Sequence, residues 1–156
     1  MIKRLFLIIL VLYSYSVFAQ SSEQLDKFLE FNYSLPELAV MTDDVINTLL
    51  DKFFVIKATV SEIIVENTDP ENYLAYVVID DGKWLSLSDI ELYEGVLIFK
   101  GSEYAQVIPS RPPRNITPDL IVSNVSLLIL GRFVSYEVVD DRIIPYFTVH
   151  KYRIDN

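Results

Sequence analysis

The chain of 156 residues contains no cysteine and only one histidine, His150. It can therefore form no disulfide, no thiolate metal site and no cysteine nucleophile. A single histidine excludes a multi-histidine metal cluster within one chain, and no G-x-S-x-G motif marks a serine nucleophile. We therefore predict no catalytic residue, no metal site and no cofactor. The enzymatic alternative that remains is a hydrolase that uses carboxylates alone.

Positive charge is also scarce, because 13 lysines and arginines stand against 22 aspartates and glutamates, for a formal net charge of −9. Binding to a phosphate backbone depends on clustered lysine and arginine side chains, and the sequence has no large cluster of them. The composition predicts that nucleic acid is not a partner and disfavours anionic membrane surfaces. It is compatible with a protein partner or a neutral glycan.

The only long apolar run lies at the start of the chain. Two basic residues precede an unbroken apolar run over residues 5–12, and Ala19 supplies a small residue just before Gln20. This pattern is typical of a cleaved secretory signal. The alternative is an uncleaved anchor, but a spanning helix needs about 20 apolar residues and polar residues interrupt this run. We predict a signal peptide over residues 1–19, cleavage between Ala19 and Gln20, and a periplasmic or secreted product without stable membrane insertion.

Residues 20–52 have helical patterning. Ser21 is a candidate N-cap for a helix over about residues 22–31. Thr42 is a candidate N-cap for a second helix, and the apolar residues between Val45 and Phe53 recur at helical spacing after it. These residues are therefore predicted to form an N-terminal helical segment.

From residue 53 onward the apolar pattern changes to the period of a β-strand. The first strand slips phase at Ser61 and Glu62, which predicts a β-bulge. Further strands are predicted over residues 73–79, 83–88, 96–99, 104–108, 125–136 and 143–154, with turns at residues 80–82 and 140–141 and a surface loop over residues 109–123. The pattern predicts a mainly β domain over residues 53–156, either a barrel of five to six strands or a small antiparallel β-sandwich.

Two segments near the end of the chain carry a resemblance to a known fold. Residues 128–132 (LILGR) resemble the strand that often opens the last hairpin of an OB-fold, and residues 144–149 (IPYFTV) resemble its closing strand. The resemblance implies an OB-like barrel over about residues 53–154. Residues 96–108 depart from it, because they add a strand or hairpin beyond the usual five. The resemblance assigns no functional residue.

Aromatic and arginine side chains are the candidate binding residues. Tyr73, Trp84 and Tyr104 lie on the central predicted strands, where exposed aromatic rings contact sugars or proteins; the alternative is that they pack in the core. Trp84 is out of phase with the neighbouring leucines, so we expect it to be exposed. Arg111 and Arg114 lie in a stiff proline-rich loop, which is either a docking segment or a surface connection.

Three other patterns have simpler explanations. Tyr76 is expected to face inward. His150 is expected to be a half-exposed strand residue on the same face as Tyr146, Thr148 and Tyr152. Residues 67, 69 and 71 have the spacing of calcium ligands, but Val78 stands where the bidentate glutamate is required, so we expect a solvated turn.

These observations favour an exported, non-enzymatic binding or scaffolding module that recognises a protein or an envelope glycan. The alternatives are a structural subunit of an envelope complex and the carboxylate-based hydrolase mentioned above.

Overall fold

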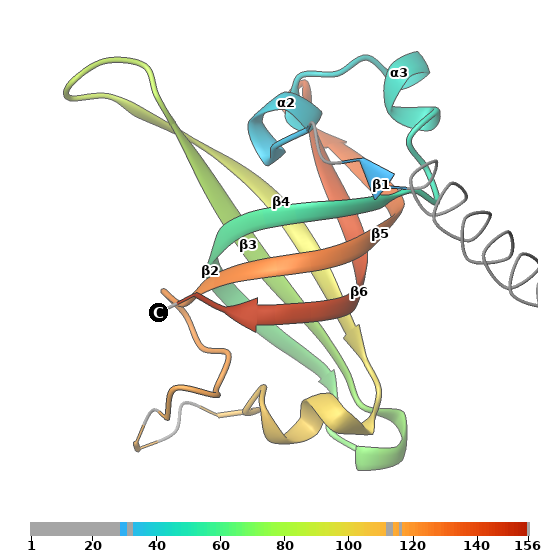
Figure 1. Cartoon of the computed structure of the whole chain (residues 1–156), viewed down its shortest axis with the longest axis vertical. Coiled ribbons are helices and arrows are strands. Elements are labelled where there is room, and N and C mark those ends of the chain that lie inside the picture. Colours follow the sequence, from blue (N-terminus) through green and yellow to red (C-terminus); the bar gives the residue numbers. More distant parts are fainter. Residues whose placement is uncertain (1–28, 31–32, 112–113, 116, 156) are drawn as a thin grey trace, which may run out of the picture.

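The computed structural model describes residues 29–30, 33–111, 114–115 and 117–155 (Figure 1). The predicted signal peptide and its cleavage site lie outside the described residues, as do residues 22–28 of the first predicted helix. The described chain is mainly β, as predicted. Its elements are β1 (Leu29–Glu30), α2 (Leu35–Ala39), α3 (Asp43–Asn47), β2 (Phe53–Asn67), η1 (Pro70–Asn72), β3 (Leu74–Trp84), β4 (Ile90–Lys100), η2 (Ser102–Gln106), β5 (Ser126–Val139) and β6 (Arg142–Ile154), where η marks a 3-10 helix.

Five strands close into a ring, in the order β2-β3-β4-β6-β5 and back to β2. The β4–β6 pair is parallel and the other four pairs in the ring are antiparallel. Figure 1 shows the resulting small barrel, with β1 pairing in parallel with the start of β2. The predicted barrel is therefore confirmed over the sandwich alternative.

The predicted bulge in the first long strand is confirmed. Val60 pairs with Ile79 and Glu62 pairs with Val78, which leaves Ser61 as the extra residue. Before the bulge, β2 buries Phe54 and every second residue up to Val60. The bulge lets this long strand pair with β5 along its first half and with β3 along its second half.

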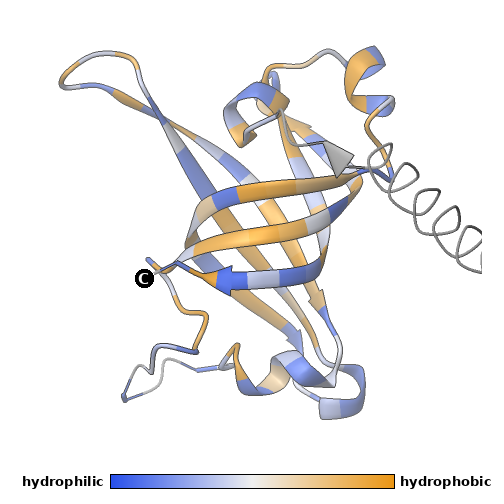
Figure 2. Ribbon diagram, in the orientation of Figure 1, coloured by the Kyte–Doolittle hydropathy of each residue, from blue (hydrophilic) through white to orange (hydrophobic). Residues whose placement is uncertain are grey.

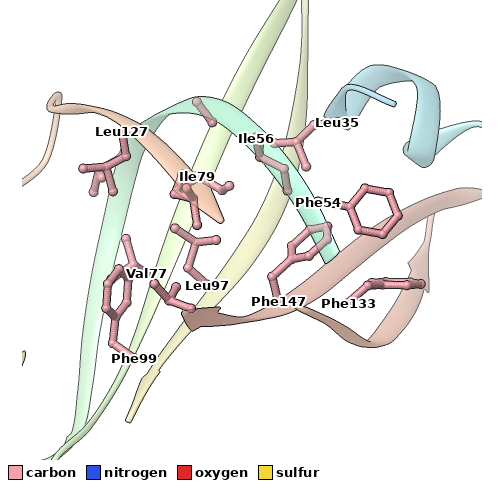
Figure 3. Packing of buried hydrophobic residues seen from close by; sticks show 14 of the residues in the cluster. Leu35, Phe54, Ile56, Val77, Ile79, Leu97, Phe99, Leu127, Phe133 and Phe147 are labelled. Atoms are coloured by element: carbon pink, nitrogen blue, oxygen red, sulfur yellow. The ribbon is translucent and has the colours of Figure 1, made fainter. Parts of the chain in front are cut away.

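The inward faces of the five strands fill the barrel. Apolar and polar residues are interleaved along the strands (Figure 2), as expected where one face is buried. Phe54, Phe133 and Phe147 are fully buried, and their ring centroids lie 5.5–6.0 Å apart (Figure 3). Such edge and tilted contacts between aromatic rings stabilise a core beyond the area that they bury.

Two short segments close the ends of the barrel (Figure 1). At one end, α2 begins with a capping box in which the Ser34 backbone N–H and hydroxyl both donate to Glu37. Its Leu35 is fully buried, and a Cβ atom at Gly95 would lie only 2.9 Å from Leu35 Cδ2. At the other end, η2 buries Tyr104 next to Phe99, with the ring centroids 5.0 Å apart.

The structure corrects the predicted hairpin. Residues 80–82 do not form a turn; β3 continues through them to Trp84, and the turn lies at residues 85–89. The separate strand predicted over residues 83–88 is therefore wrong, because β3 ends at Trp84 and residues 85–88 lie in the turn. The strand predicted over residues 96–99 is confirmed as part of β4, which is longer and runs from Ile90 to Lys100. The strand predicted over residues 104–108 is also wrong, because this segment lies largely in η2. The described residues between positions 109 and 123 form no strand, as predicted.

The N-terminal segment also differs from the prediction. Residues 29–30 form a strand rather than the end of a helix. Thr42 is the N-cap of α3, as predicted, but this helix ends at Asn47 and Phe53 begins β2. The prediction missed α2, although Ser34 and Glu37 have the spacing of a capping box in the sequence.

Candidate interaction surface

A two-stranded arm projects from the barrel. The last pair between β2 and β3 joins Thr59 and Asp80, whereas pairing between β3 and β4 continues to Trp84 and Ile90. Residues 81–93, which we call the arm, therefore extend beyond the ring as a ribbon of β3 and β4 (Figure 1, upper left). Most side chains of the arm are exposed or half-exposed, and Tyr93 at its base is buried.

The two faces of the arm have opposite character, because side chains alternate along each strand. One face carries Trp84, Ile90 and Leu92, which are 67%, 45% and 54% exposed. Gly82 lies on this face too, and a Cβ atom there would be 2.7 Å from Ile90 Cδ1, so the Ile90 side chain lies flat against the ribbon. We call this the apolar face of the arm.

The opposite face of the arm carries charged residues, with Asp81 paired to Tyr93 and Lys83 paired to Glu91. The loop at the tip adds two exposed apolar residues, Leu85 and Leu87, and the Leu87 side chain is fully exposed. Figure 2 shows apolar segments continuing into this loop, far from the core. Contiguous exposed apolar side chains of this kind mark interaction sites on soluble proteins.

The base of the arm is fixed to β6 by Arg142. Its guanidinium forms an ion pair with Glu91, donates to the Leu92 carbonyl at 3.4 Å, and lies 5.2 Å from the centre of the Tyr93 ring. The Tyr93 hydroxyl donates a hydrogen bond to Glu91. This hydrogen bond, followed by the charge of Arg142, holds the pKa of Glu91 below its usual value. The same hydrogen bond is the main reason why the pKa of Tyr93 is raised.

Glu91 is expected to stabilise the fold at neutral pH and to lose this contribution in acid. Its pKa is lower in the folded than in the unfolded protein, so the contribution is complete above the unfolded pKa and disappears as the pH falls through the folded one. The difference in unfolding free energy between the wild type and Glu91→Gln should therefore be larger at about pH 7 than at about pH 3. Urea denaturation at both pH values measures it. An equal difference at both would show that Glu91 does not contribute in this way.

The apolar face of the arm continues onto the outside of the barrel. Tyr76 pairs with Ile98, and Val78 pairs with Val96, which in turn lies beside Tyr146 on β6. We call these five residues the outer wall. The four residues on β3 and β4 lie on the same side of the ribbon as Trp84, since each is an even number of residues from Trp84 or from its partner Ile90 along the strand. Tyr146 is the neighbour of Val96 on β6. Burial, a hydrogen bond with Glu137 and the charge of Glu137 raise the pKa of Tyr146.

The predicted aromatic site residues do not lie together. Trp84 is exposed, as predicted. Tyr73 and Tyr104 are buried, so the prediction that they contact a ligand on the surface is corrected: Tyr73 donates a hydrogen bond to the Ile108 carbonyl at 2.8 Å, and Tyr104 packs on Phe99. Tyr76 was expected to face inward, but it lies on the outer wall, because Ala75, Val77 and Ile79 are the inward residues of β3.

The two predicted arginines lie in a different part of the chain from the arm. Arg111 lines a cleft of about 670 Å³ between β2 and residues 109–123, whose walls include Ile63, Val65 and Val122. Arg114 is exposed in the same connection. No residue of the arm lines this cleft. The prediction that these arginines bind a partner stays a prediction.

The remaining polar candidates have local structural roles. His150 is exposed and its ring lies 4.8 Å from that of Phe53, but Tyr152 does not share its face, because it packs on the buried ring of Phe99. The register shift beside Gly131 accounts for this change of face. Asp69 accepts hydrogen bonds from the Glu71 backbone at 3.1 Å and from the Asn72 side chain at 3.0 Å, which is the predicted turn.

Within the described ranges, no group of three or more acidic, cysteine or histidine side chains is arranged to hold a metal ion. In the same residues, no helix is long and apolar enough to cross a membrane. No protein family model matches the chain, and a comparison with curated proteins found no significant match.

Proposed function

We propose that this protein is an exported, non-enzymatic binding module that recognises another protein through the arm. The observation that carries the proposal is the exposure of Trp84, Ile90 and Leu92 on one face of a ribbon that projects from the barrel. Tryptophan dominates many interfaces, because its large and rigid ring buries much apolar area at a low entropy cost. Arg142 supports this role, since it fixes the base of the arm before a partner arrives.

We further propose that the barrel is an OB-fold. A five-stranded Greek-key barrel with the order β2-β3-β4-β6-β5 and a parallel β4–β6 pair supports this assignment. The helical segment η2 between β4 and β5 closes one end of the barrel, which is also consistent with it. OB-folds bind ligands on the face formed by their central strands. In this chain that face is the outer wall, and the arm extends it.

A capture experiment tests the proposed function. The mature protein, residues 20–156, is immobilised and exposed to an envelope extract of the source organism. We expect a partner to be retained by the wild type and lost by a Trp84→Ser/Leu87→Ser variant. Both replaced residues are exposed, so the free energy of unfolding should change by less than about 0.5 kcal/mol.

The matched control is Val40→Ser/Val45→Ser, which removes exposed apolar side chains from the N-terminal segment instead. It should retain the partner. A partner that binds the arm variant as well as it binds the wild type would refute recognition through the arm and would direct attention to the cleft beside Arg111.

A further inference from the structure

Four carboxylates lie within and beside the apolar surface formed by the outer wall and the arm. Asp80 and Glu94 pair directly with each other between the two apolar parts. Glu62 pairs with Val78 at one side, and Glu137 is hydrogen-bonded to Tyr146 at the other. Each is exposed or half-exposed at its strand position. The apolar surface therefore has an acidic centre and an acidic rim.

The Asp80–Glu94 pair is unusual, because like charges directly opposite each other on two strands destabilise a sheet. No lysine or arginine of the described chain forms an ion pair with either of them, nor with Glu62 or Glu137. The Ser61 hydroxyl donates to Asp80 at 3.2 Å, which positions that carboxylate without neutralising it. The cation on the arm, Lys83, lies on the opposite face, directly across the two strands from Glu91.

We propose that the partner segment is basic as well as apolar, with a lysine or arginine that inserts between Asp80 and Glu94. This inference rests on the proposed function and names the partner that the arm would recognise. The charge of the surface supports it, because a cation from the partner would neutralise two carboxylates that form no ion pair with any other described residue. Apolar residues on either side of that cation would then cover the outer wall and the apolar face of the arm.

The register gives the spacing of the partner's residues. The Val78–Val96 pair, the Asp80–Glu94 pair and the Gly82–Leu92 pair follow one another at intervals of two residues along the ribbon. Two residues of extended chain span about 7 Å. An extended segment running along the ribbon would therefore match it with the pattern apolar-x-basic-x-apolar.

Two other occupants fit the surface less well. An anionic bilayer would be repelled by the four carboxylates within and beside the apolar surface. A second copy of the chain, related by a two-fold axis, would place the same surface against itself and would bring its carboxylates together. Both occupants are retained as outcomes of the test below.

The test uses synthetic peptides without tryptophan, so that Trp84, the only tryptophan of the chain, reports binding by its fluorescence. The probe peptide contains the pattern Leu-Ser-Arg-Ser-Leu, and two matched peptides carry glutamine or glutamate in place of arginine. We expect the arginine peptide to shift Trp84 emission to shorter wavelength and to bind at least about 10-fold more tightly than the glutamate peptide.

An Asp80→Asn/Glu94→Gln variant is the matched protein control. It should fold at least as stably as the wild type, because a like-charge pair is removed, and it should lose about 10-fold in affinity for the arginine peptide alone. Vesicles of phosphatidylcholine mixed with anionic phosphatidylglycerol, and a dilution series of the free protein, are expected to leave the emission unchanged.

Equal binding of all three peptides, an unaffected variant, or no binding of the arginine peptide would overturn the basic-partner inference. A shift with vesicles or on self-association, in the absence of a shift with the arginine peptide, would replace the partner with a membrane or a second copy. The proposed function fails by a different result: in the capture experiment, the Trp84→Ser/Leu87→Ser variant would keep the partner that the wild type retains.

Discussion

Phe147→Ala is expected to lower the free energy of unfolding by about 3–5 kcal/mol, the usual cost of truncating a fully buried phenylalanine. Phe147 is inaccessible to solvent and touches both other rings of the cluster, with centroid distances of 5.6 Å to Phe54 and 5.5 Å to Phe133. It also leaves little room for relaxation, because a Cβ atom at Gly131 would lie 3.0 Å from Phe147 Cβ. Its loss would leave a cavity where β2, β5 and β6 meet.

Equilibrium denaturation in urea, followed by circular dichroism, measures this change. Phe147→Leu keeps most of the buried volume and should cost less than half as much as Phe147→Ala. Val138→Ala, at an exposed position of β5, should change the unfolding free energy by less than about 0.5 kcal/mol. A loss below about 1 kcal/mol for Phe147→Ala would contradict a tightly packed ring cluster.

Leu35→Ala is the second change with a large expected effect, about 2–5 kcal/mol of unfolding free energy. Leu35 lies in a helix of five residues, which is too short to be stable alone. The helix therefore depends on the packing of the Leu35 side chain against the barrel. The side chain is fully buried and approaches Gly95 of β4. Removing it would open this end of the barrel to water.

The control for Leu35→Ala comes from the same segment. Val40 follows α2 directly and is 69% exposed, so Val40→Ala should leave the unfolding free energy within about 0.5 kcal/mol of the wild type. Thermal denaturation of the two variants in parallel makes the comparison. A Leu35→Ala variant as stable as Val40→Ala would show that the N-terminal segment does not contribute to the barrel core.

The elements that sequence reasoning predicted correctly are those set by local patterns. The alternation in β2 and its phase slip predicted both the strand and the bulge at Ser61, because a half-buried strand must repeat every two residues. The turn at Asp140 and Asp141 was also predicted, and both residues have positive φ angles (50° and 62°), which aspartate tolerates better than most residues.

The errors came from features that only the pairing of strands decides. The Asp80-Asp81-Gly82 sequence has the composition of a turn, yet β3 continues through it. The actual turn, residues 85–89, contains Leu85 and Leu87, whose alternation with serine looks like strand interior. Because the position of the turn sets which residues face each other, this error separated Trp84 from Ile90, its partner across the arm.

The candidate site was predicted only in part for the same reason. The predicted exposure of Trp84 was confirmed, but its phase relative to the neighbouring leucines is not the reason, because Leu85 and Leu87 are exposed too. Ile90 and Leu92 were missed, because the sequence pattern of exposed apolar residues in a strand is the same as that of buried ones. Only the projection of the arm from the barrel shows that they are exposed. Tyr73 and Tyr104 were candidates for the surface, with core packing as the alternative. Contacts distant in sequence contribute to the burial of both, through Ile108 for Tyr73 and Tyr152 for Tyr104.

Site-specific photo-crosslinking in the source organism tests recognition through the arm most directly. A photoreactive amino acid is placed at Leu87 on the tip of the arm or, as a control, at Val45 on α3; both positions are exposed. We predict a defined adduct with another protein from position 87 and none from position 45. Adducts from position 45 alone, or none from position 87 in cells where the protein is fully folded, would contradict a role for the arm in binding.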